Sequence, residues 1–229
     1  GQRVLLERFS DAAEHGEEPR DAIRVWPLQL LFHNIGWYLA YEADAVGHDH
    51  GLIRTERLDR LALRQVDAGF RRSPEQRACA VARLARLMEL SGGIYFGDDA
   101  ALQQQVAAAD TELLKGLLTT VRFRCTERVY RFLREGLQRY PLGQIRLSKP
   151  LPGDRWRAPA HAPLLLEPDA SHTHPFPVEL DLPAWTVARD VDFRRWLFGY
   201  GADLLIEGPE PLRAEHAQRA AAVTGLYAP

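Results

Sequence analysis

The sequence of 229 residues has few of the features that mark secreted or membrane proteins. Its two cysteines, Cys79 and Cys125, are too few and too far apart for a disulfide framework, which indicates a cytoplasmic protein with free thiols. No apolar run reaches the length of a membrane span, and no signal peptide is visible, so the sequence predicts no membrane partner.

Catalytic and metal-binding motifs are also missing. The sequence holds no glycine-rich phosphate loop, no G-x-S-x-G motif and no H-E-x-x-H motif. Two histidine pairs, His48 with His50 and His172 with His174, have no Cys or Glu ligand set of metal spacing nearby. Cys125 falls at a predicted strand end, where a small core residue is the expected role rather than a reactive thiolate. We therefore expect no enzyme, no metal and no cofactor.

Lysine is rare, and arginine carries almost all of the positive charge. Only Lys115 and Lys149 are lysines among 29 basic residues, and the formal net charge is -2. Residues 54–86 hold nine arginines against four acidic residues, and residues 119–149 hold eight basic residues against two acidic ones. The guanidinium fork suits bidentate binding of phosphate or carboxylate, although genomic base composition also enriches arginine.

The first part of the chain has the alternation of short antiparallel strands. Residues 4–9 predict one strand, and residues 26–41 predict a hairpin whose turn, Asn34-Ile35-Gly36, leaves Gly36 free to take a positive φ. Residues 52–61 predict the next strand. Four to five short strands in about 65 residues favour a small β-barrel over a sandwich, and we assign residues 1–68 to this domain.

Helices and a second α+β domain follow. Ser73-Pro74 with Gln76 predicts a capped helix start, and an apolar stripe continues it to Ser91-Gly92-Gly93. A second helix is predicted over residues 98–115, so residues 69–117 are interpreted as linker helices. Residues 118–229 predict the order β-α-β, a proline-rich loop over residues 150–177, β-α-β and a closing helix. That order is typical of a ferredoxin-like α+β domain.

Arginines of the strand over residues 52–61 are candidate ligand-binding residues. Side chains alternate along a strand, so Arg54 and Arg60 share one face and Arg57 takes the other. A bulge would be needed to bring Arg57 beside Arg54 in an anion pocket. The alternative is that Arg57 and Arg60 pair with Glu56 and Asp59 as solvated surface charges, which is common.

The predicted hairpin supplies further candidates. Trp37 and Tyr41 are expected in the core, and Tyr38 then faces the other way, where its ring could stack on a base. Tyr38 and Ser10 would complete the anion pocket. His33, at the turn, is either a second ligand contact or a solvated side chain.

A third group of arginines lies on the helix predicted after residues 118–125. Arg128, Arg131 and Arg134 recur at every third residue and would form a basic ridge that contacts a phosphate backbone. The alternative is a solvated helix face balanced by Glu127 and Glu135.

Several of these stretches together resemble the WYL domain, a small ligand-sensing barrel of bacterial regulators. They are Trp26-Pro27-Leu28, Gly36-Trp37-Tyr38-Leu39 and Arg54-x-x-Arg57-Leu58-Asp59-Arg60-Leu61. The second half resembles the C-terminal extension named WCX, which commonly follows this domain, through residues 90–97, 120–125 and 192–204.

This resemblance implies an Sm- or SH3-like barrel whose effector pocket is formed by Ser10, Tyr38, Arg54 and Arg57, with His33 at a further position. It implies a homodimeric transcriptional regulator whose effector is a nucleotide or a nucleic acid, either single-stranded DNA or RNA. The helix-turn-helix of the family is absent from this sequence; either it belongs to an upstream segment, or the protein regulates something other than a promoter. The alternative is a stand-alone accessory protein that binds RNA or single-stranded DNA and modulates a CRISPR or phage-defence effector.

Overall fold

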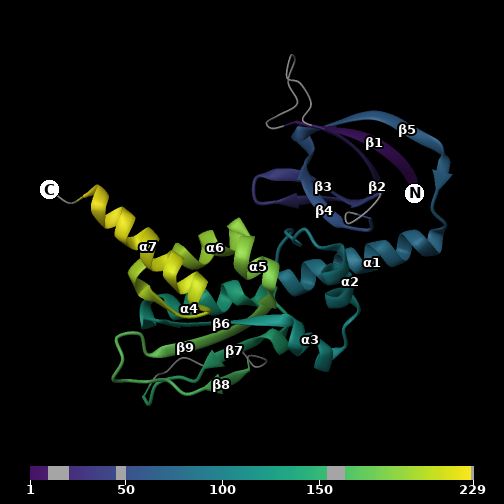
Figure 1. The fold of residues 1–229 in the computed structure, drawn as a ribbon. Coiled ribbons are helices and arrows are strands. Elements are labelled where there is room, and N and C mark those ends of the chain that lie inside the picture. Colours follow the sequence, from purple (N-terminus) through teal and green to yellow (C-terminus); the bar gives the residue numbers. More distant parts are fainter. Residues whose placement is uncertain (10–20, 45–49, 154–162, 228–229) are drawn as a thin grey trace. The chain divides into compact units, whose positions relative to one another are not determined.

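The computed structural model describes residues 1–9, 21–44, 50–153 and 163–227 (Figure 1). The chain divides into two compact units, the first made of residues 1–88 and 94–110 and the second of residues 89–93 and 111–229. Within the described ranges each unit contains a five-stranded sheet together with helices, which confirms the predicted α+β class.

The first unit is built on an antiparallel sheet with the strand order β4-β3-β2-β1-β5. Its elements are β1 (Gln2–Arg8), β2 (Asp21–His33), β3 (Gly36–Ala43), β4 (Ile53–Arg57), the 3-10 helix η1 (Leu58–Arg60), β5 (Leu61–Arg71), α1 (Pro74–Ser91) and α2 (Ala100–Ala108). The last turn of α1 belongs to the second unit. A bulge in β2 between Pro27 and Gln29 interrupts the pairing with β3, and bulges of this kind bend a sheet.

A small β-barrel was predicted, and the described residues form no closed barrel. The sheet is strongly curved (Figure 1), but its edge strands β4 and β5 are not paired with each other there. The strand predicted over residues 52–61 is also interrupted, because η1 redirects the chain from one edge of the sheet to the other. The backbone N–H of Phe9 donates to the carbonyl of Arg60 across 3.0 Å, which holds this turn against the end of β1.

The β2–β3 hairpin turns at Asn34 and Ile35 rather than through a strained Gly36. Asn34 has a φ of 52°, in the left-handed region that asparagine tolerates, whereas Gly36 is not among the glycines with positive φ. Gly36 instead lies where side chains approach the backbone. A β-carbon there would stand 3.7 Å from the ring of Tyr38 and 3.9 Å from Nε of Arg57.

Both faces of the first sheet carry buried residues. On one face Val4, Leu6, Val25 and Tyr41 form a small cluster, and on the other Ala40 and Ile53 are fully buried. The edge strand β4 is tied to α2 by Gln103, which is fully buried. Its Oε1 accepts from the Ile53 N–H at 2.8 Å and its Nε2 donates to the Ile53 carbonyl at 2.9 Å, so a side-chain amide satisfies the edge of the sheet.

The second unit has the strand order β10-β6-β9-β7-β8, in which only β7 and β8 run parallel. Its elements are α3 (Thr111–Leu117), β6 (Leu118–Cys125), α4 (Glu127–Gly136), η2 (Leu137–Arg139), η3 (Leu142–Gln144), β7 (Ile145–Ser148), β8 (Leu164–Leu166), β9 (Phe176–Pro183), α5 (Ala184–Arg189), α6 (Val191–Phe198), η4 (Gly201–Asp203), β10 (Leu204–Gly208) and α7 (Glu210–Leu226). The predicted repeat of β-α-β order is present. The loop predicted over residues 150–177 is interrupted by β8.

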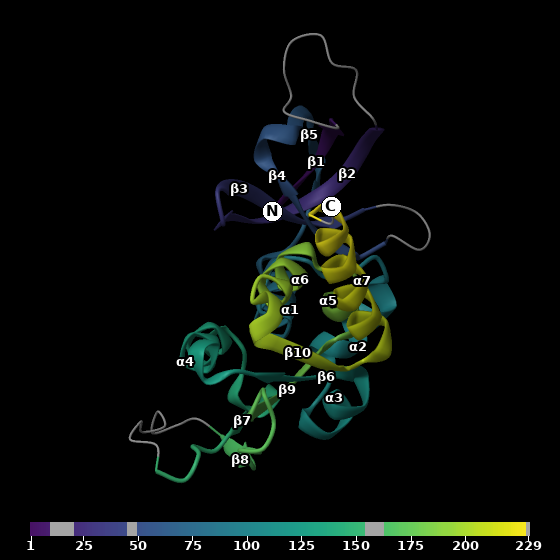
Figure 2. The same ribbon diagram turned by 90° about the vertical axis from the view of Figure 1, so that its left-hand side faces the viewer.

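Helices cover one face of the second sheet (Figures 1 and 2), and the core lies between them. Phe123 and Leu180 of the sheet and Leu133 of α4 are fully buried there. The opposite face carries charged rows that run across the strands. Arg146 donates to Asp181 and to Glu179 at 2.6–2.8 Å, so acidic partners neutralise this face.

Residues 69–117, expected as linker helices, contain the end of β5 and helices α1 to α3, and they are divided between the two units. The capping box at the start of α1 is confirmed, because Ser73 N–H donates to Gln76 Oε1 and Gln76 N–H donates to Ser73 Oγ. The single helix predicted over residues 98–115 is wrong. It is two helices, because Ala109 has extended backbone angles and ends α2.

Candidate ligand-binding site

Three of the predicted pocket residues lie together at the end of the β2–β3 hairpin. Tyr38 and Arg57 are directly opposite each other in the β3–β4 register. The ring of His33 stands 6.2 Å from the ring of Tyr38 in an edge-on arrangement. Ser10, the fourth predicted member, lies outside the described residues.

Arg54 does not join this group. The register of β3 with β4 is regular from Tyr38–Arg57 to Glu42–Ile53, without the bulge that would bring Arg54 beside Arg57. Arg54 is therefore opposite Tyr41, and the two arginines line separate hollows.

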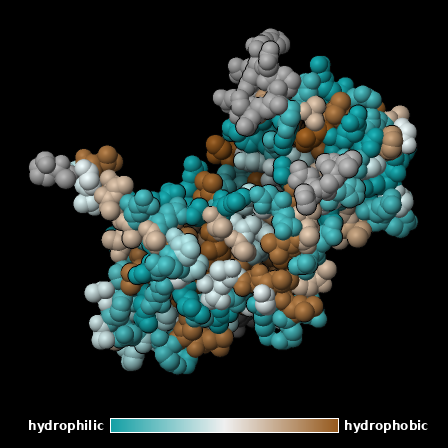
Figure 3. Space-filling model, viewed as in Figure 1, coloured by the Kyte–Doolittle hydropathy of each residue, from teal (hydrophilic) through white to brown (hydrophobic). Residues whose placement is uncertain are grey.

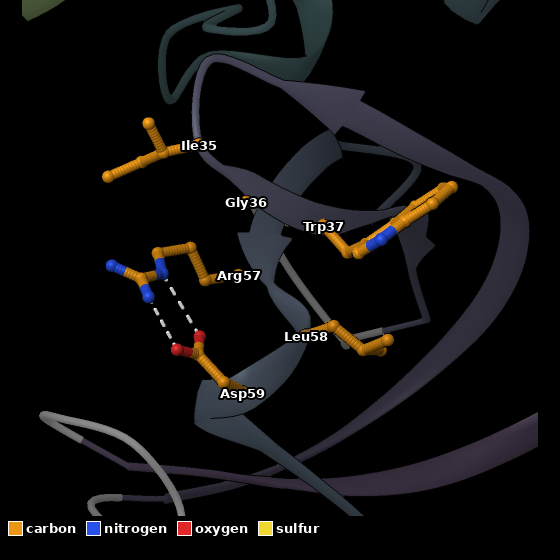
Figure 4. A pocket seen from close by; sticks show the side chains of 6 residues that line it. All are labelled: Ile35, Gly36, Trp37, Arg57, Leu58 and Asp59. Carbon is orange, nitrogen blue, oxygen red and sulfur yellow. Dashed lines mark hydrogen bonds and ion pairs between the residues drawn. The ribbon is translucent and has the colours of Figure 1, made fainter.

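The first of these, called here the Arg57 hollow, has a volume of about 410 Å³ and is lined by Ile35, Gly36, Trp37, Arg57, Leu58 and Asp59. In Figure 4 the side chains of Arg57 and Ile35 point to one side of the strands and those of Trp37 and Leu58 point to the opposite side. This agrees with the register, because Arg57 is opposite Tyr38, which alternates with Trp37. Nε of Arg57 donates to Oδ1 of Asp59 across 3.0 Å, and a second nitrogen contacts Oδ2. This bidentate pair is the surface charge pairing that the sequence offered as the alternative.

The rim of the Arg57 hollow is apolar and exposed. Trp37, which was predicted to lie in the core, has 55% of its surface exposed, so that prediction is wrong. Its ring lies 5.4 Å from that of Phe32, which is 63% exposed and directly opposite in the hairpin register. Figure 3 shows hydrophobic residues interrupting the hydrophilic surface of the first unit. The two-residue turn at Asn34 and Ile35 pairs Phe32 with Trp37. This pairing could have shown from the sequence that the two aromatic rings lie side by side.

The second hollow, called here the Arg54 hollow, has a volume of about 260 Å³. It is lined by Arg8, Tyr41, residues 53–56 of β4 and residues 94–98. The hydroxyl of Tyr41 donates to Oε2 of Glu56 across 3.0 Å, and burial together with this carboxylate raises the pKa of the phenol. Nε of Arg8 donates to Asp21 at 2.6 Å, and this hydrogen bond raises the pKa of Arg8. No pattern in the sequence singles out Arg8 or Glu56 for this role.

The predicted basic ridge on α4 is only partly present. Arg128 is exposed but donates to Asp203 across 3.2 Å, which raises the pKa of the arginine and lowers the pKa of the carboxyl group. Arg131 is exposed, whereas Arg134 is half-buried with its guanidinium 5.2 Å over the ring of Tyr130. Arg60, in η1, is half-buried as well.

The described residues have further features that concern metal binding, thiol chemistry and membrane crossing. No group of three or more His, Cys, Asp or Glu residues there could hold a metal ion. His48 lies outside the described residues. Cys125 is fully buried, as predicted, and burial raises the pKa of its thiol to about 12, which makes it unreactive. None of the described helices is long and apolar enough to cross a membrane.

No family model and no curated protein matches the chain. Solved structures resemble it weakly, among them the following two. One is described as the crystal structure of a CRISPR Cas-related protein, at 13% identity and a TM-score of 0.44, over 98% of this chain and 47% of that one. The other is proteasome accessory factor B/C (PafBC) of Arthrobacter aurescens, at 15% identity and a TM-score of 0.35, over 99% of this chain and 26% of that one. The chain thus spans less than half the length of either protein, and similarity at this level assigns no family.

Proposed function

We propose that this chain is the effector-sensing and dimerising part of a WYL-type transcriptional regulator, and that its effector is a nucleotide or a single-stranded nucleic acid. One observation carries the proposal. The Arg57 hollow is lined by a guanidinium, which suits a phosphate, and by an exposed indole, which suits the face of a base. Tyr38 and His33 stand beside the guanidinium side of the same site.

Asp59 would compete with a ligand phosphate for the guanidinium of Arg57. Its carboxylate holds the guanidinium of Arg57 in a bidentate pair at the surface, and exposed pairs of this kind contribute only about 0.2–1 kcal/mol. A phosphate that approaches Arg57 can therefore displace Asp59 at small cost. Asp59 lies in η1, which connects β4 to β5, so the displacement would act on the turn that joins the two edges of the sheet.

In the regulator, occupancy of the site would shift the population between two arrangements of a homodimer and so change DNA binding by a separate segment. The proposal keeps residues 1–68 as the WYL sensing domain, residues 69–117 as linker helices and residues 118–229 as the WCX domain. It places the protein in the cytoplasm and includes no catalytic step, metal or cofactor.

The second candidate is an accessory protein that carries RNA or single-stranded DNA to a CRISPR or phage-defence effector. The exposed apolar rim favours it, because Phe32, Ile35 and Trp37 together offer a surface for a partner protein. The open reading frame separates the two candidates, since a helix-turn-helix encoded directly upstream supports the regulator.

Fluorescence anisotropy with a labelled single-stranded oligo(dT) tests the proposed site. We expect Arg57→Ala to weaken binding by roughly tenfold, which corresponds to about 1.4 kcal/mol. The matched control is Arg64→Ala, which removes an exposed arginine of β5 paired with Glu7. Equal affinities of wild type and Arg57→Ala would rule the site out.

A further inference from the structure

The chain passes from one compact unit to the other at three points, after residues 88, 93 and 110. The middle passage differs from the others because the segments on both sides of it are held by named contacts. Residues 89–93 belong to the second unit, and residues 94–98 belong to the first.

Inside the second unit, two polar contacts hold the end of α1. The carbonyl of Leu90 accepts from Nε2 of Gln144 across 3.0 Å. Oγ of Ser91, itself fully buried, accepts from Nε1 of Trp185 across 3.1 Å. These contacts fix the last turn of α1 to the unit that it has entered.

The two glycines that follow are fitted closely to the second unit. Gly92 has a φ of 62°, and a β-carbon on it would stand 2.1 Å from the ring of Tyr140, so only glycine fits there. A β-carbon on Gly93 would lie 3.3 Å from Oδ2 of Asp190. Both glycines therefore lie close to side chains of the second unit.

Inside the first unit, the next residues are held equally directly. Oγ1 of Thr55 on β4 donates to the carbonyl of Ile94 across 2.7 Å. Nε2 of Gln103 donates to the carbonyl of Phe96 across 3.1 Å. Only Gly92 and Gly93 separate Ser91, held in the second unit, from Ile94, held in the first.

Residues 94–98 are also one wall of the Arg54 hollow, whose other wall is β4. The hollow presents the guanidinium groups of Arg8 and Arg54 together with the carboxylate of Glu56 and the hydroxyl of Tyr41. Cations beside acceptors suit a ligand that carries both an anion and neutral hydrogen-bond donors, as one nucleotide residue does. The volume of about 260 Å³ lies at the small end for ligand pockets and fits a single such residue.

We infer that the Arg54 hollow is a second subsite for a nucleotide residue of the effector, and that residues 89–98 transmit its occupancy to the second unit. The inference rests on the proposed function and adds to it. A ligand that contacts the wall formed by residues 94–98 displaces or stiffens Ile94. Because only Gly92 and Gly93 separate Ile94 from the held residues Leu90 and Ser91, the change reaches the last turn of α1.

Hydrogen exchange with oligo(dT) present and absent tests this in the full chain. In the wild type we expect slower exchange in residues 94–98 and in residues 89–93. Arg54→Ala should weaken oligo(dT) binding by up to about tenfold, and at oligo(dT) concentrations that saturate the variant through the Arg57 hollow it should lose both responses. Two glycines inserted between Gly93 and Ile94 should leave the response of residues 94–98 and abolish that of residues 89–93.

The matched control carries two glycines between Asp110 and Thr111, at another passage between the units, and should respond as the wild type does. Equal responses of residues 89–93 in both insertion variants would overturn the transmission. An unchanged response in Arg54→Ala, or binding without any response in residues 94–98, would overturn the subsite. Inorganic phosphate and thymidine, added separately, should each give less than the response to oligo(dT). These outcomes differ from the one that would overturn the proposed function, which is equal oligo(dT) affinity of wild type and Arg57→Ala.

Discussion

Nε of Arg57 donates to Oδ1 of Asp59 across 3.0 Å, inside the hollow where a ligand phosphate would bind. Asp59 therefore competes with the ligand for the same guanidinium. We expect Asp59→Asn to raise affinity for oligo(dT) by about fivefold, because an exposed pair of this kind contributes up to about 1 kcal/mol. Anisotropy titrations at two salt concentrations measure the change.

The control for this prediction is Glu7→Gln, which removes the same charge from another arginine pair of the first unit, that with Arg64. A gain shared by both variants would show a general electrostatic effect rather than competition at Arg57. A loss of affinity in Asp59→Asn would mean that Asp59 positions Arg57 for the ligand.

Trp37 allows a test that separates ligand binding from stability. Because its ring is more than half exposed, Trp37→Ala should change the free energy of unfolding by no more than about 0.5 kcal/mol. If bases stack on this ring, the same variant should lose about 1–3 kcal/mol of oligo(dT) binding. Urea unfolding and anisotropy titration measure the two quantities.

Phe132→Ala is the matched variant, since Phe132 is an exposed aromatic residue of α4 far along the chain from the hairpin. It should leave oligo(dT) affinity unchanged. A large loss of stability in Trp37→Ala would instead show that Trp37 packs in the core, as the sequence predicted.

Much of the first sheet could be predicted because its alternation is local. The hairpin and the capped start of α1 follow from residues close together in the chain, and both are confirmed. The exposure of Trp37 could not be predicted in this way. Alternation places a side chain on one of two faces, but tertiary packing decides whether that face is covered at a given point.

The site was harder to predict because it depends on irregular backbone. The sequence required a bulge in β4 to bring Arg54 beside Arg57, whereas the register shifts of this sheet lie in the β2–β3 and β1–β5 pairings, and η1 follows β4 directly. Residues 94–98 line the Arg54 hollow although they are about forty residues from β4 along the chain. Hydrogen bonds from Thr55 to Ile94 and from Gln103 to Phe96 hold them there. No periodicity within the strands signals contacts of that kind.

Gln103 provides a stability prediction. Its buried amide satisfies both backbone groups of Ile53, and replacement by leucine would leave these groups without that partner. At about 1–3 kcal/mol for each of these two unsatisfied buried groups, Gln103→Leu should destabilise the first unit by about 2–6 kcal/mol. Gln105→Leu, at an exposed position of the same helix, should have little effect in the same urea unfolding experiment. Similar midpoints for the two variants would contradict the role given to Gln103.

His216 of α7 makes stability depend on pH near neutrality. Its ring stacks on Phe198 with centroids 5.1 Å apart, and burial lowers its pKa below the ordinary value of 6.5. Arg219, also over Phe198, and Glu215 lie on the same helix. The unfolded chain therefore binds the proton more readily, so the free energy of unfolding should fall as the pH falls through about 6.5.

We expect the melting temperature of the wild type to drop more between about pH 7.5 and 5.5 than that of His216→Gln, because glutamine does not titrate. Parallel curves would show that the fold does not favour the neutral ring, and a steeper fall in the variant would assign the pH dependence to another group.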